Sequence, residues 1–141
     1  MGEFINFQIK GIEALEFNIT EPKVKIESEN TFGFELLLEH NIDLEKNSVA
    51  VECYIKIGSE NNATQFAALK TVCIYEIPDL NSHAISTKDN IKLPDSLVVS
   101  LNSVTISTVR GVAFTLFRGT YLHNAILPII DPSVLTPTSE S

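Results

Sequence analysis

Three histidines are the side chains of this 141-residue chain best suited by type to acid–base catalysis or metal binding. His40 falls on the apolar face of a strand pattern, His83 in a polar stretch and His123 among aliphatic residues. No pair of them has metal-ligand spacing, and no G-x-S-x-G motif marks a nucleophilic serine. The glycines stand singly, unlike those of a phosphate-binding loop. The sequence therefore predicts a protein that is not an enzyme, with no catalytic residues, no metal and no cofactor.

The two cysteines also give no sign of a reactive site. Cys53 and Cys73 are far apart in the sequence and lack the C-x-x-C spacing of a zinc or thioredoxin-like motif. Each lies inside a strand-like run, which favours a pair of buried, reduced thiols that pack as small apolar side chains. A disulfide between neighbouring strands is the alternative.

Composition excludes several classes of partner. Ten basic residues face 18 acidic ones, which gives a net charge of −8, and the basic residues are scattered singly. Such a surface repels a phosphate backbone, so we expect no nucleic-acid partner. The first ten residues lack the basic and apolar regions of a signal peptide, and no apolar run reaches the roughly 18 residues of a membrane span. These features predict a cytoplasmic protein without membrane insertion.

Alternation of apolar and polar residues predicts strands through the first half of the chain. Ile5 to Ile19 alternates, with a break that indicates a bulge or bend near Gly11. Phe32 to Glu45 and Val49 to Ile57 form a hairpin, and Phe66 to Ile77 is apolar on both faces, so it is central or covered twice. The short loops predict an antiparallel meander of about four strands.

Three further segments connect or end these elements. Lys23 to Thr31 alternates charged and apolar residues, as a short edge strand or a loop does. Pro78 to Leu93 has no period and is interpreted as a crossover loop. A single domain is expected over residues 1–132, because the chain has an ordinary length for one core, and residues 133–141 are expected to be a flexible tail.

The most apolar stretch, Pro94 to Pro132, begins either with a helix or with a pair of strands. Apolar residues from Asp95 to Leu116 recur at helical spacing, and strict alternation fits them no better, so we predict a long helix. Gly119 stands where a left-handed helix cap is expected. Tyr121 to Ile130 should then pack irregularly across the core. The fold class is therefore predicted to be α+β: a four-stranded antiparallel sheet followed by one long helix.

This chain has more apolar residues than one small sheet and one helix can bury against each other. Such a surplus indicates an oligomer interface, a binding groove, or both. The acidic strand face Glu35, Glu39, Asp43 and Glu45 is either a solvated surface or a docking face for a basic partner.

In this order of elements the chain resembles the SecB family of export chaperones. The residues that carry the resemblance are Phe7-Gln8-Ile9, Glu21-Pro22, Arg118-Gly119-Thr120-Tyr121, Asn124, Leu127 and Pro128. The last group resembles the R-G-T-F…N-L-x-P segment between the two helices of that family, although here Asp131 and Pro132 leave room for one helical turn at most.

The resemblance implies an ATP-independent holdase that binds unfolded or non-native polypeptides, for protein export or in a toxin-antitoxin system. It also implies a homo-oligomer, with the long helix at a dimer interface and dimers paired into a tetramer. The residues expected to bind clients are Phe32, Phe34, Tyr75, Tyr121, Leu122, Ile126 and Ile129. Those expected at the oligomer interface are Leu97, Leu101, Val104, Thr108 and Val112. Glu16 matches one acidic position that the family uses to meet the SecA motor.

A second hypothesis belongs to a different class of function. The protein would be a non-catalytic structural or interaction module whose apolar surface serves only self-association or one dedicated partner. Binding of many unrelated unfolded chains separates the first hypothesis from the second.

Overall fold

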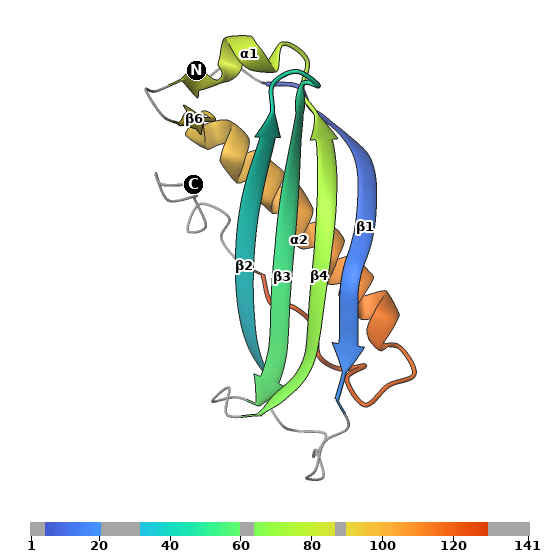
Figure 1. The fold of residues 1–141 in the computed structure, drawn as a ribbon. Helices are drawn as coiled ribbons and strands as arrows, with labels where there is room; N and C mark the ends of the chain where they lie inside the picture. Colours follow the sequence, from blue (N-terminus) through green and yellow to red (C-terminus); the bar gives the residue numbers. More distant parts are fainter. Residues whose placement is uncertain (1–4, 21–31, 60–63, 87–89, 130–141) are drawn as a thin grey trace.

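A computed structural model describes residues 5–20, 32–59, 64–86 and 90–129 of the chain. The elements are β1 (Gln8–Ile19), β2 (Phe32–Asp43), β3 (Ser48–Ser59), β4 (Gln65–Glu76), α1 (Leu80–His83), β5 (Ile85–Ser86), β6 (Ile91–Lys92) and α2 (Asp95–Phe117). The first four strands form one antiparallel sheet, and α2 packs on one of its faces (Figure 1). The predicted α+β class is confirmed.

The strand order in the sheet is β1-β4-β3-β2. β2, β3 and β4 are the predicted meander, joined by short connections. β1 does not extend that meander at β2 but lies antiparallel beside β4, which gives the sheet a Greek-key order. β4 is therefore a central strand, which explains why its sequence is apolar on both faces.

The break in the β1 pattern has a structural cause. The pairing of β1 with β4 shifts between Ile9 and Gly11 and again between Ala14 and Glu16. Ile9 pairs with Tyr75 and Ile12 with Cys73, so the first shift brings both isoleucines to the face that α2 covers. A β-bulge of this kind lets an out-of-phase apolar residue rejoin the inner face, and the bulge expected near Gly11 is confirmed.

The stretch from Pro78 to Leu93 contains more structure than the expected crossover loop. It holds the single turn of α1 and the two-residue strands β5 and β6, which pair with each other. Leu80 and Leu93 are buried and close the end of the core where α2 begins. The expected edge segment Lys23 to Thr31 and the expected tail, residues 133–141, lie outside the described residues.

The long helix is present over one residue more than predicted. Asp95 places a carboxylate in the first turn, where it interacts favourably with the helix dipole. Gly119 follows the helix with φ of 80°, the left-handed conformation expected of a terminating glycine. Because α2 is rich in β-branched residues, its stability depends on packing against the sheet.

By length and composition α2 could also cross a membrane, contrary to the expectation that no segment would qualify. One face of the helix is nonetheless buried against the strands. Its buried residues are Leu97, Val98, Leu101, Asn102, Thr105, Ile106, Val109, Ala113 and Phe117. A helix that packs in a protein core meets the same criteria of length and hydropathy.

Candidate polypeptide-binding surface

The path of α2 leaves one corner of the inner sheet face without a helix above it. Figure 1 shows α2 crossing behind the sheet on a diagonal, from beside β2 to beside β1. Contacts fix both ends of this path: Asn102 in its first half bonds to His40 on β2, and the ring of Phe117 at its end lies 5.9 Å from that of Phe17 on β1. The corner where β2 begins and β3 ends is covered by other residues.

The segment after α2 covers that corner, and we call residues 120–129 the strap. In Figure 1 it turns back beneath the end of α2 and passes behind the sheet toward β2. Leu122, Ala125 and Leu127 of the strap are buried in one cluster with Ile55 and Ile57 of β3. The expectation that this segment packs irregularly across the core is confirmed for its described residues, which lie in turns or outside regular structure.

A row of aromatic rings lines the same corner. Phe66 of β4 lies between Phe32 of β2 and Tyr121 of the strap, with ring centroids 6.2 Å and 6.1 Å away and both pairs edge to face. Phe32, Phe34 and Tyr121 are half-buried and pack against the cluster. Aromatic rings with one open side offer large apolar contact area to any ligand at little entropic cost.

The exposed end of the strap adds two aliphatic side chains to this surface. Ile126 is 53% exposed and Ile129 94% exposed. Both were expected to contact clients. They lie in the chain next to or near Ala125 and Leu127, which belong to the cluster that Phe32, Phe34 and Tyr121 pack against. These five residues form the candidate surface.

Two of the expected client-binding residues lie in the core instead. Tyr75 is 0% exposed, and its hydroxyl lies 2.7 Å from Oγ1 of Thr105 on α2. Leu122 is also 0% exposed, because it packs in the buried cluster with Ile55 and Ile57 of β3. Neither side chain can touch a client in this conformation, so we correct both assignments.

The predicted interface stripe on α2 is also partly wrong. Leu97 and Leu101 pack on the sheet and are buried, whereas Val104 is 36% exposed and Thr108 and Val112 are half-buried. The buried positions continue through Thr105, Val109 and Ala113, one residue after each later position of the predicted stripe, so the stripe moves to the edge of the buried face. The exposed residues of α2 include Ser100, Val104, Ser107, Gly111 and Phe114, none of which is charged.

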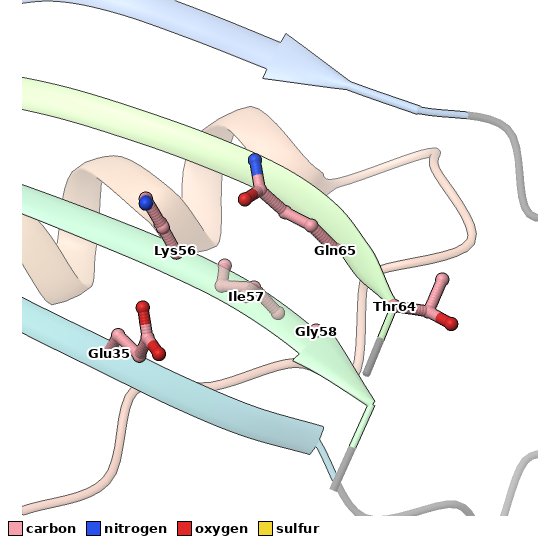
Figure 2. Close-up of a pocket in the computed structure, with 6 residues that line it drawn as sticks. All are labelled: Glu35, Lys56, Ile57, Gly58, Thr64 and Gln65. Carbon is pink, nitrogen blue, oxygen red and sulfur yellow. The ribbon is translucent and has the colours of Figure 1, made fainter. Parts of the chain in front are cut away.

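The opposite sheet face carries Glu16. It pairs with Lys70 and lines a shallow depression of about 180 Å³ with Leu37, Glu39, Glu52, Tyr54 and Lys70. A second hollow on this face, of about 40 Å³, lies between Glu35 and Lys56 near the end of β3 (Figure 2). Their mixture of charges, and their openness to solvent, gives neither hollow an evident chemical role.

The two cysteine thiols are buried and resist ionisation. Burial, together with the charge of Cys73, raises the pKa of the Cys53 thiol to about 12, and burial raises the pKa of Cys73 as well. Both thiols are reduced and buried, which agrees with the favoured interpretation of the sequence. Within the described ranges no three histidine, cysteine or acidic side chains gather as a metal site would require.

Arg110 is the residue that sequence reasoning missed. Its Nε donates to the carbonyl oxygen of Leu127 and its Nη2 to that of Pro128, each over 2.8 Å. The available signal was charge: Arg110 is the lone cation within the α2 sequence, and a cation in the middle of an apolar helix needs a partner.

Comparison of structures finds similar folds, whereas comparison of sequences finds none. No model of a known protein family matches the chain, and no curated protein matches its sequence. Among solved structures, the Mycobacterium tuberculosis Rv1957 SecB-like chaperone, in complex with a ChAD peptide from the Rv1956 HigA1 antitoxin, aligns with a TM-score of 0.58. The alignment covers 88% of this chain and 89% of that chain at 13% identity. The fold is SecB-like. At this identity the likeness concerns architecture, and it confirms the four-stranded sheet and long helix expected from the resemblance.

Proposed function

We propose that this protein is an ATP-independent holdase of SecB type that binds unfolded or non-native polypeptides. The observation that carries the proposal is the apolar corner of the SecB-like sheet. Half-buried aromatic rings pack there against the cluster that contains Ala125 and Leu127, and the nearby strap residues Ile126 and Ile129 are exposed. The solved SecB-like chaperone supports it, since that protein was captured with a bound peptide.

The chemistry of this surface suits ligands of varied sequence. Rings and aliphatic side chains bind any large apolar residue without requiring a particular hydrogen-bonding group. A client needs only exposed apolar side chains, which folded proteins bury and unfolded chains display. Function of this kind involves no bond-making step and no cofactor.

Suppression of aggregation tests the proposal. Light scattering from a chemically denatured client should fall when the protein is added in several-fold excess. Ile129→Asp should weaken this protection at little cost in stability, because its side chain is almost wholly exposed. Leu37→Asp is the matched control, since Leu37 is exposed on the opposite face. Scattering that is unchanged by a several-fold excess of wild-type protein would exclude the holdase.

We also propose that the protein self-associates, as a dimer or as a pair of dimers. The uncharged outer face of α2 supports this, with Val104 and Phe114 exposed on it, and so do the exposed Ile12 and Leu15 on β1. Light scattering coupled to size exclusion should give a mass above 15.6 kDa. Phe114→Glu should lower that mass, whereas Ser96→Glu at the helix start should not, and a wild-type monomer would contradict the proposal.

The same apolar surfaces support the second candidate, an interaction module devoted to self-association or to one partner. It predicts a stable oligomer that leaves denatured clients unprotected, so the two experiments above separate the candidates.

The cellular setting of the proposed holdase is protein export or a toxin-antitoxin system in the cytoplasm. The exposed Glu16 on β1 supports docking to a SecA-type motor. Loss of binding to such a motor in a Glu16→Lys variant with intact client protection would assign export. Binding of an antitoxin peptide with no affinity for the motor would assign the other setting, and cell fractionation tests the compartment.

A further inference from the structure

The strap has features of a bound ligand as well as of a structural segment. From Ala125 to Pro128 its residues alternate between burial and exposure: Ala125 and Leu127 are buried, whereas Ile126 and Pro128 are exposed. The backbone there is neither helix nor strand. An extended polypeptide that inserts alternate side chains into an apolar corner shows the same alternation, so residues 125–128 occupy the corner as a client segment would.

The two ends of the strap are attached differently. At the near end the Tyr121 hydroxyl donates to the carbonyl of Thr20, and more weakly to that of Phe66. The Thr120 hydroxyl donates to Phe117 over 2.6 Å and accepts from the amide of Leu122. These contacts join the strap to β1, β4 and the end of α2, so the near end is a fixed hinge point.

The far end is attached through Arg110. Among the described contacts, the hydrogen bonds of residues 126–129 are those that the guanidinium donates to Leu127 and Pro128. The guanidinium is partly exposed, and its acceptors are main-chain carbonyls, which every polypeptide possesses. A client backbone can therefore offer Arg110 the same two acceptors that the strap supplies.

We propose that residues 120–129 are an internal cover over the client-binding corner and that Arg110 is the latch that holds it closed. This inference rests on the proposed function, because a cover regulates only what binds beneath it. Release of the latch lets Leu127 and Ala125 leave the corner while Tyr121 keeps the strap attached. The client then gains the sites of Ile55 and Ile57 beneath, and its affinity is set by the fraction of molecules in which the strap is open.

The test compares Arg110→Ala with Arg118→Ala. Both remove one positive charge. The side chain of Arg118 is exposed at the end of α2, and among the described residues it makes no hydrogen bond or ion pair to the strap. Two probes are used: the fluorescence of the apolar dye bis-ANS, and the anisotropy of a labelled, reduced and carboxymethylated polypeptide. Arg110→Ala should raise dye fluorescence and lower the Kd for the polypeptide by at least about threefold, and Arg118→Ala should change neither.

Each result bears on a different part of the argument. Unchanged dye fluorescence in Arg110→Ala, or an equal rise in Arg118→Ala, would overturn the latch. A rise in dye fluorescence confined to Arg110→Ala, with no polypeptide bound by any variant, would uphold the cover and refute the holdase.

Hydrogen exchange of the wild-type protein provides a second measurement that needs no variant to fold. The amides of residues 125–127 should lose protection when the carboxymethylated polypeptide is bound, while that of Leu122 near the hinge changes less. Retained protection of residues 125–127 in the complex would refute displacement of the strap.

Discussion

His40 should make the stability of this protein depend on pH between 5 and 7. Its Nε2 lies 2.7 Å from Oδ1 of Asn102 on α2, and in register it faces Val51 of β3. Its Nδ1 is buried with no hydrogen-bond partner. A proton added there would be a buried donor without an acceptor, which costs free energy.

The sign and size of the effect follow from this environment. Burial lowers the pKa of His40 below its usual 6.5, although the bond to Asn102 opposes part of the shift. The unfolded chain therefore takes up a proton below pH 6.5 that the folded protein does not bind until the pH passes its own lower pKa. Stability is full above pH 6.5 and is lost through that window, at up to about 1.4 kcal/mol per pH unit. From pH 6.5 to 5 the loss is at most about 2 kcal/mol.

Urea unfolding at pH 5, 6 and 7 measures this slope. His40→Gln keeps an amide that can bond to Asn102 but cannot titrate, so its stability should vary less across the same range. His123→Gln, which replaces an exposed imidazole, is the comparison variant. Equal slopes in the wild type and His40→Gln would refute the reasoning.

Three further predictions concern packing and reactivity. A Cβ at Gly58 would lie 2.4 Å from the carbonyl oxygen of Thr64, so Gly58→Ala should lower the free energy of unfolding by about 1–3 kcal/mol. Gly111→Ala, on the open face of α2, should raise it by about 0.5–1 kcal/mol. Urea denaturation compares the two variants, and similar unfolding free energies would contradict the steric argument. Tyr75→Phe removes the hydroxyl that bonds to Thr105 and should cost about 1 kcal/mol, with an unchanged thermal midpoint as the contrary result. Cys53 and Cys73 are buried and have raised pKa values. They should therefore react with a thiol reagent at pH 8 only after the protein unfolds. Rapid labelling of the native protein would contradict this and show that the inner sheet face opens.

The candidate site shows where sequence reasoning reached its limit. The client-binding assignment of Ile126 and Ile129 could be made from the sequence, because the segment that contains them is more apolar than a solvated tail would be. Tyr75 and Leu122 were assigned to the client-binding surface but lie in the core. Apolar periodicity and composition indicate that a side chain faces inward, but they do not tell whether it is fully buried or only half-buried. The same limit applied to Arg110, whose sequence neighbours say nothing about carbonyls 17 and 18 positions away.

Local patterns by themselves determined the four strands, the long helix, its glycine end and the bulge near Gly11. Each of these features depends on residues that are close together in the chain, either within one or two helical turns or along one alternating strand. Such patterns can be read from the sequence alone. The tertiary structure decided that β1 lies beside β4, that α2 crosses the sheet on a diagonal, and that the strap covers the remaining corner. These features depend on contacts between distant residues, and the diagonal path determined which face of α2 is buried and which corner is left for the strap.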